Sequence, residues 1–292
     1  MTRRRFLASL ALIGGGAALW PAATWANPGA APELPTPFAL PARELDRAGV
    51  LREVTSVVSR QAREVGAPTT YAARVGPIAE RVDFLHPFQF LVTSYFERDP
   101  ARRDALLAAY AREPAAAIRE LGPAFPSPRA EMILNTLAYY DVSADRIRVN
   151  LGRITPDDAA RVLVHEFWHA LPDLRTWKGE DGATLRTTGF WTQRLTSEQG
   201  IWQPLDDTDG LPHPAYLLNE AMATQMEVRY AGPTKFKRPD LDGANGYLAR
   251  LSETAGSADV MEAYLRSRPG ELHELAEQHQ AARVDAGALP RT

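Results

Sequence analysis

The spacing of apolar residues predicts that the first half of the chain is mostly helical. Between residues 43 and 65, apolar side chains recur every three or four positions, which places them on one face of a helix. Further helical segments are expected over residues 86–97, 100–112, 114–121 and 129–140. Prolines stand in the first turn of the segments at 100 and 114, where a missing N–H costs nothing.

A different pattern follows in the second half. Apolar and polar residues alternate over residues 146–151, and this period of two predicts a half-buried β-strand. Thr155 and Pro156 then make a strong helix start, and the two acids that follow favour the positive end of the helix dipole. This helix is expected to end at Pro172, which cannot continue it.

The rest of the chain predicts both strands and helices. Short apolar and threonine-rich runs over residues 184–204 are consistent with strands or a hairpin. Pro214 begins a helix that ends near Gly232, and from residue 241 to about residue 283 helical runs alternate with glycine and proline breaks. Together these elements predict an α-rich α+β fold.

Proline content predicts a boundary near the N-terminal end of the folded part. Residues 27–41 contain five prolines and are predicted to form an extended linker. Residues 42–292 are expected to form a single domain. Its front half, 42–144, is expected to be mostly helical, and its back half, 145–292, contains the candidate metal-binding residues.

The amino-acid composition limits which residues can bind a metal or act as a nucleophile. The chain of 292 residues contains no cysteine, which excludes disulfides, iron–sulfur clusters, thiolate zinc sites and cysteine nucleophiles. Any bound metal must therefore be held by His, Asp or Glu. The formal net charge of -3 gives no reason to expect a nucleic-acid partner.

The segment His165-Glu166-Phe-Trp-His169 carries the clearest chemical signal. Two histidines four residues apart on a helix lie on the same face, so both imidazoles can reach one metal ion. Glu166 is rotated by about 100° from that face, close enough to act on a water molecule without binding the metal. This geometry is what metal-assisted hydrolysis requires.

Zinc needs a third protein ligand. The metzincin pattern would require Gly at 172 and His at 175, but this chain has Pro172 and Arg175. Asp173 follows the helix-ending proline too soon to be a comfortable ligand, although it stays open as an alternative. Glu220 is the better candidate, because apolar neighbours predict that it is buried, and a buried carboxylate needs a positive partner.

The stretch from about residue 140 to residue 229 resembles the HExxH zinc metallopeptidases of the gluzincin type. Such chains run from a strand to the His-Glu helix, then through a Thr-Gly-Phe-like strand, here residues 188–190. A Leu-Asn-Glu-Ala segment on a second helix, here residues 218–221, follows. The resemblance covers roughly a third of the chain after residue 26.

This resemblance implies a zincin-like fold, with a strand before the active-site helix, a small mixed sheet and a second ligand helix. It implies that zinc is held by His165, His169 and Glu220, and that Glu166 is the general base and later the proton donor to the leaving amine. Peptides or proteins would be the substrates. An extended peptide is expected to pair with the strand at 146–151, a candidate edge strand.

Two features depart from the thermolysin-like members. They carry Asp four residues after the third ligand, where this chain has Thr224, so a carboxylate brace to a ligand histidine is missing or comes from elsewhere. The interval from His169 to Glu220 is also longer. Candidate oxyanion stabilisers are Tyr216 and His213, although core packing and a solvated loop are ordinary explanations for these two residues.

The first 26 residues resemble a twin-arginine export signal. Residues 2–8 read Thr-Arg-Arg-Arg-Phe-Leu-Ala and depart from that pattern only at Ala8, where Lys is typical. The apolar stretch is short and broken by glycines, which favours cleavage near Ala26 over an uncleaved membrane anchor. The resemblance implies a periplasmic or secreted protein that meets the export machinery transiently and keeps no stable membrane span.

The sequence therefore predicts an exported zinc-dependent metallopeptidase. One alternative is a catalytically silent metal- or peptide-binding protein on a peptidase scaffold, although the intact Glu166 argues against it. Another is an exported structural or tethering factor in which His165 and His169 are merely buried.

Overall fold

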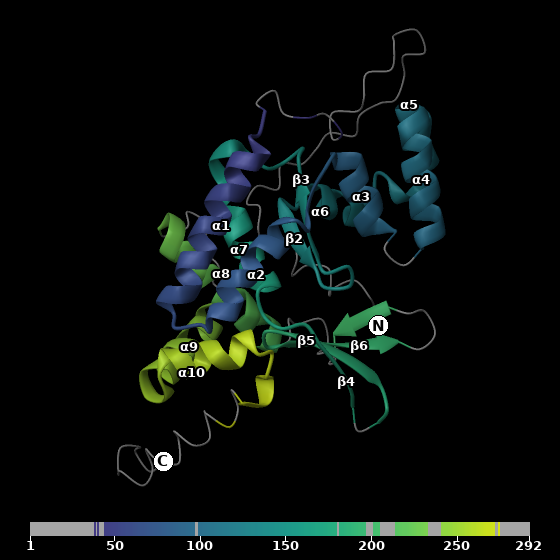
Figure 1. Cartoon of the computed structure of the whole chain (residues 1–292). Helices are drawn as coiled ribbons and strands as arrows, with labels where there is room; N and C mark the ends of the chain where they lie inside the picture. The colour runs from purple at the N-terminus through teal and green to yellow at the C-terminus, as the bar shows by residue number, and fades with distance from the viewer. Residues whose placement is uncertain are drawn as a thin grey trace.

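The structure, a computed structural model, is α-rich and contains two small sheets, in agreement with the predicted α+β class (Figure 1). It describes residues 38, 40, 44–96, 99–179, 181–196, 201–204, 214–232, 241–271 and 274. The predicted export signal and His213 lie outside these residues. Among the helices that are described, none is long and apolar enough to cross a membrane.

Most of the predicted helices are confirmed, with ends that shift by a few residues. The helices of the described chain are α1 (Arg47–Glu64), α2 (Thr69–Ala79), α3 (Pro87–Tyr95), α4 (Pro100–Arg112), α5 (Pro114–Glu120), α6 (Pro128–Asn135), α7 (Pro156–Ala170), α8 (Pro214–Ala231), α9 (Asp242–Ala255) and α10 (Ser257–Leu265). Helix α2 follows Pro68 directly and was not predicted.

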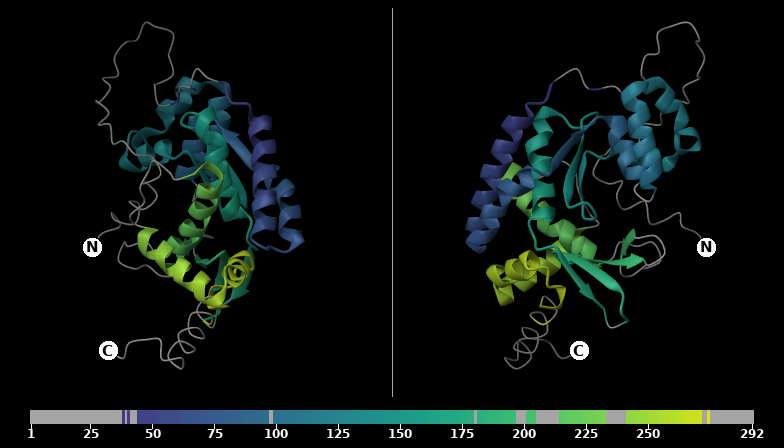
Figure 2. Two further views of the ribbon diagram at one scale, coloured as in Figure 1. Left: turned by 90° about the vertical axis from the view of Figure 1, so that its left-hand side faces the viewer. Right: turned by 45° about the vertical axis from the view of Figure 1, so that its right-hand side comes forward.

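The described strands form two separate sheets. They are β1 (Val82–Leu85), β2 (Ala138–Asp141), β3 (Arg146–Asn150), β4 (Arg175–Lys178), β5 (Thr184–Thr188), β6 (Trp191–Thr196) and β7 (Ile201–Pro204). The second sheet is antiparallel in the order β4-β5-β6-β7 and confirms the strands predicted over residues 184–204. It extends beside α10 at the opposite end of the molecule from α4 (Figures 1 and 2).

Helix α6 ends at Asn135, although the sequence predicted that it would continue through residue 140. The side-chain amide of Asn150 donates to the carbonyl oxygens of Leu134 and Thr136, at 3.0 and 3.1 Å. Thr136 is already extended, so the helix cannot propagate. The next residues form β2, because β3 offers them a hydrogen-bonding edge that helical periodicity does not reveal.

Strand β3 lies in the centre of the first sheet, so the prediction that residues 146–151 form an edge strand is wrong. The order is β1-β3-β2, with β1 parallel and β2 antiparallel to β3. The segment Val82–Leu85 lacks a clear polar–apolar alternation, which is why its pairing with β3 was not predicted. Among the strands of the described residues, β2 is therefore the free edge on this side of the sheet.

The register of β2 fixes which backbone groups face away from the sheet. Ala138 lies opposite Val149, and the N–H of Asn150 donates to the carbonyl oxygen of Leu137 at 2.9 Å. Ala138 and Val149 are therefore a non-hydrogen-bonded pair. In an antiparallel ladder the bonded pairs alternate, so the N–H and C=O groups of Ala138 and Tyr140 point to the free edge.

Two hydrophobic cores lie against the first sheet. The larger core joins α1, α2, α7, α8, α9 and α10 to the sheet face that carries Ile147 and Val149. The smaller core joins α3 to α6 and includes Phe38, which is fully buried and contacts Phe88 and Phe125. Phe38 falls within the segment predicted to be a linker, so at least this residue packs onto the folded domain.

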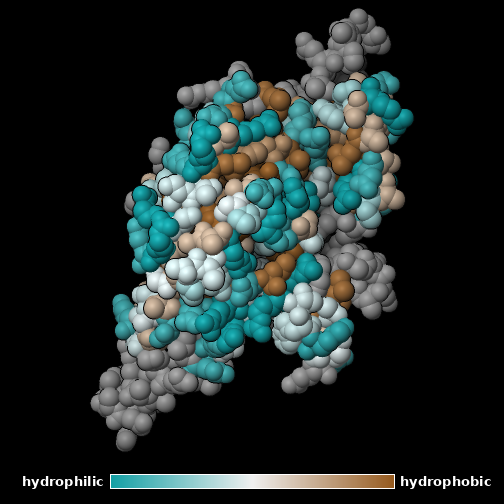
Figure 3. Space-filling model, in the orientation of Figure 1, coloured by the Kyte–Doolittle hydropathy of each residue, from teal (hydrophilic) through white to brown (hydrophobic). Residues whose placement is uncertain are grey.

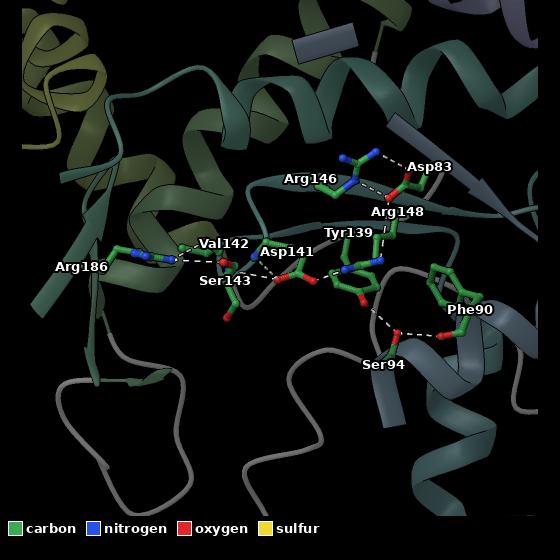
Figure 4. A network of polar contacts seen from close by, with 11 residues as sticks. Asp83, Phe90, Ser94, Tyr139, Asp141, Val142, Ser143, Arg146, Arg148 and Arg186 are labelled. Atoms are coloured by element: carbon green, nitrogen blue, oxygen red, sulfur yellow. Dashed lines mark hydrogen bonds and ion pairs between the residues drawn. The ribbon is translucent and has the colours of Figure 1, made fainter. Parts of the chain in front are cut away.

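Polar contacts tie the two sheets together next to β2 (Figure 4). Arg148 donates to Asp141 at 2.9 Å, and these side chains are only 13% and 10% exposed. Arg186 of β5 donates to the carbonyl oxygens of Val142 and Ser143, just after β2, at 3.0 and 3.4 Å. Arg148 thus joins β3 to β2 within the hairpin, and Arg186 joins this hairpin to the second sheet.

Candidate metal centre

Helix α7 presents both histidines of the predicted motif on one buried face. The Thr155 hydroxyl accepts a hydrogen bond from the N–H of Asp158 at 3.2 Å, and Pro156 occupies the first turn, as the sequence predicted. His165 and His169 are only 6% and 8% exposed. Their Nε2 atoms lie 3.1 Å apart.

Helix α8 packs on α7 and brings Glu220 to the two imidazoles. Its Oε1 lies 3.3 Å from Nε2 of His169, and its Oε2 lies 3.7 Å from Nε2 of His165. The three ligand atoms lie within 4.8 Å of one another, and all three residues are buried. Tetrahedral zinc with bonds of about 2.0–2.1 Å separates its ligand atoms by about 3.3 Å, so the spacing fits.

The charges of this cluster are strongly coupled. Burial alone would lower the pKa of His165, but hydrogen bonds to Glu220 and Glu227 outweigh it and raise the pKa to about 10. Burial would raise the pKa of Glu220, but hydrogen bonds from both histidines hold it well below its ordinary value. Without a metal, a proton on His165 compensates the carboxylates, and a cation bound there would replace that proton.

Glu227 supplies the carboxylate brace that sequence analysis did not find. Nδ1 of His165 lies 3.1 Å from Oε2 of Glu227, and Arg161 donates to the same carboxylate. Glu227 follows Glu220 by seven residues, two helical turns, so it lies on the same face of α8. That spacing was a usable signal, whereas the family pattern directed attention to Thr224.

His169 is supported by the hairpin that joins β5 and β6. Asn219 Nδ2 lies 3.5 Å from Nδ1 of His169, and Asn219 Oδ1 accepts the N–H of Phe190 at 3.0 Å. The Thr188 hydroxyl donates to the carbonyl oxygen of His169 at 3.3 Å. The Thr-Gly-Phe segment was expected to be a strand, but Thr188 ends β5 and the next two residues form the turn before β6. This turn supports His169 through its backbone carbonyl and through Asn219.

Gly189 permits this close packing. Its φ of +57° lies in the left-handed region, and an added Cβ would lie 2.1 Å from Asn219 Oδ1 and 2.5 Å from a ring carbon of Tyr264. The N–H of Gly189 donates to the Ser267 hydroxyl at 2.8 Å. No other residue type fits this turn without displacing Asn219.

Glu166 is buried beside the cluster and is not one of the converging ligands. Burial raises the pKa of its carboxyl, while the two imidazoles and the N–H of Tyr140 act in the opposite direction. Tyr140 belongs to β2, and its N–H is one of the groups that point to the free edge. Glu166 therefore lies between the histidine cluster and the edge of β2.

Three candidates remain: Asp173, Tyr216 and His213. Asp173 accepts hydrogen bonds from Arg74 at 2.6 Å and from Tyr71 at 3.1 Å, and it does not join the ligand group. The ring of Tyr216 lies 5.6 Å from the ring of Trp191, centroid to centroid. His213 lies in a part of the chain that the structure does not describe.

Comparisons of the chain with protein families, curated proteins and solved structures find no match.

Replacing Glu227 by Gln is expected to weaken metal binding by about 10–100-fold, because His165 loses the partner that fixes its ring and raises its basicity. The affinity is measured by zinc competition with a chromophoric chelator near neutral pH. Thr224→Ala is the matched control on the same helix and is expected to bind zinc like the wild type. Equal affinities of wild type and Glu227→Gln would show that Glu227 is no brace.

Gly189→Ala is expected to lower the free energy of unfolding by about 2–4 kcal/mol, from a strained φ and from overpacking against Asn219. Gly182→Ala is the control, because Gly182 has a φ of +76° but no atom within 4 Å of an added Cβ. It is expected to cost about 1 kcal/mol. Urea unfolding measures the free energy of unfolding of both variants. Equal decreases would show that the contact with Asn219 does not contribute to the cost of Gly189→Ala.

Proposed function

We propose that this chain is an exported zinc-dependent metallopeptidase. The observation that carries the proposal is the convergence of His165, His169 and Glu220 from two helices into one buried group, with Glu166 beside it. Glu227 strengthens it, because a carboxylate on the outer nitrogen of a histidine is a common accompaniment of metal ligation. A histidine pair that is merely buried needs neither a third carboxylate nor a brace.

The donor set favours zinc. Two imidazole nitrogens and one carboxylate leave a tetrahedral ion one open position, as in catalytic zinc sites, whereas structural zinc sites are closed by four protein ligands. When bound in such a site, zinc acts as a Lewis acid that polarises a carbonyl and makes water a stronger nucleophile near neutral pH. His165, His169 and Glu220 are the residues that would hold it.

Glu166 is the proposed general base. Its carboxylate lies next to the two imidazoles without joining the ligand group, so it is free to accept a proton from attacking water. The same carboxyl then donates that proton to the leaving amine. The N–H of Tyr140 orients this carboxyl by a hydrogen bond.

The proposed substrate-binding strand is β2 in place of the strand at 146–151. The N–H and C=O groups of Ala138 and the C=O of Tyr140 point to the free edge of the sheet. An extended peptide that pairs with this edge would run past Glu166. For the oxyanion, Tyr216 and His213 remain the candidates that the sequence offers.

Export by the twin-arginine route and a periplasmic or secreted location are part of the proposal and rest on residues 2–8. That route carries proteins already folded, which suits an enzyme whose metal site is assembled from two helices far apart in the sequence.

Cleavage of a mixed peptide library, read by mass spectrometry, tests the activity. The wild type is expected to cleave, and Glu166→Gln is expected to lower the rate by about 10²–10⁴-fold while keeping its metal, because Glu166 handles the proton and does not bind the ion. Glu131→Gln, an exposed acid on α6, is the matched control and is expected to retain full activity.

The outcome separates the two leading functions. Cleavage that Glu166→Gln abolishes would establish the peptidase and report its subsite preference. A wild type that binds zinc but cleaves nothing would favour the silent metal- or peptide-binding protein instead.

A further inference from the structure

A second candidate site lies away from the metal centre, in a cavity of about 680 Å³. Its walls come from the start of α2, the segment after α7, the start of β4 and the end of α10. The lining residues are Pro68, Thr70, Tyr71, Arg74, Asp173, Leu174, Arg175, Arg266 and Arg268. Hydrophilic residues gather on this part of the surface, below α2 and around the end of α10 (Figure 3).

The lining is cationic. It holds four guanidinium groups against the single carboxylate of Asp173, which pairs with Arg74 at 2.6 Å. Arg266 pairs with Glu262 on α10 at 2.7 Å, and Arg268 pairs with Glu271.

Positive charge remains in excess after these pairs are counted. The four arginines face three carboxylates, so one guanidinium charge is uncompensated among these groups. Within the described part of the chain, Arg175 makes no ion pair, and it is exposed at the start of β4. Exposed ion pairs such as those of Arg266 and Arg268 are weak, so a better anion can displace their partners.

We propose that this cavity binds a small organic molecule that carries an oxyanion group, a phosphate ester or a carboxylate. Guanidinium groups bind both oxyanions through paired N–H donors in a planar fork. Pro68, the N-cap residue of α2, and Thr70 in its first turn line the wall. No side chain caps this end of the helix, so the positive end of the helix dipole adds to the positive potential of the cavity.

The size and the remaining walls indicate a ligand larger than an inorganic ion. A cavity of about 680 Å³ lies in the range of sites for small molecules. Pro68, Leu174 and the ring of Tyr71 offer apolar surface beside the arginines. The guanidinium of Arg74 lies 5.3 Å from the centroid of the Tyr71 ring and also donates to the carbonyl oxygen of Pro172 at 3.2 Å. This arginine is therefore held in place before a ligand arrives.

Isothermal titration calorimetry of the full-length chain tests this proposal with three probes at constant ionic strength. Glycerol 3-phosphate and glutarate represent the two oxyanions, and glycerol is the uncharged control. We expect at least one of the two anions to bind with a dissociation constant below about 10 mM and glycerol not to bind. A phosphate ester that binds alone, or a dicarboxylate that binds alone, identifies which oxyanion the cavity takes.

Variants locate the binding in the cavity. Arg175 and Arg268 are exposed. Arg175→Gln and Arg268→Gln are each expected to weaken anion binding about tenfold, because each removes a charged hydrogen-bond donor. Asp173→Asn removes the competing carboxylate and is expected to strengthen it. Arg112→Gln, on α4 at the other end of the molecule, is the control and is expected to have no effect.

Two results would overturn the proposal. One is the absence of binding of both anions at about 10 mM. The other is a loss in Arg112→Gln equal to that in the two cavity variants, which would mean attraction to net surface charge and no defined site.

Discussion

Two imidazoles and a carboxylate are buried together between α7 and α8, and this concentration of ionisable groups constrains the rest of the molecule. A buried charge is tolerated only when it is paired and hydrogen-bonded. His165 pairs with Glu220 on one side and with Glu227 on the other, and Glu227 also pairs with Arg161. Either a proton on His165 or a divalent cation can complete the balance, and the spacing of the three ligand atoms suits the cation.

The surrounding elements position this group from three sides. Helix α8 supplies Glu220 and Glu227, the hairpin at Gly189 supports His169 through Asn219, and β2 reaches Glu166 through the N–H of Tyr140. The polar contacts between Arg186 and the segment after β2 hold the two sheets together at that point. Displacing any one of these elements would move a donor atom relative to the imidazoles, so the site depends on packing between segments far apart in the sequence.

The features that the sequence predicts correctly depend on patterns within a single helix. The cap at Thr155 and the four-residue spacing of His165 and His169 belong to one helix, so the sequence alone predicts them. In the same way, the apolar neighbours of Glu220 on its own helix predict that it is buried. The edge position of β2 and the central position of β3 depend on pairing with β1, which lies more than 50 residues earlier in the chain. The role of Glu227 depends on the register of α8 against α7, and its spacing of seven residues from Glu220 indicates only that the two carboxylates share one face of α8.

The most direct test of the account is the metal content of the purified protein together with its thermal melt before and after treatment with a chelator. The account predicts about one zinc ion per chain and a fall in the melting temperature when the metal is removed, with recovery when zinc is restored, because an ion that binds only the folded state stabilises it. A protein that holds no metal when supplied with excess zinc, and whose melt is the same with and without chelator, would contradict it. In that case a proton on His165 would balance the buried carboxylate of Glu220 in place of a metal ion.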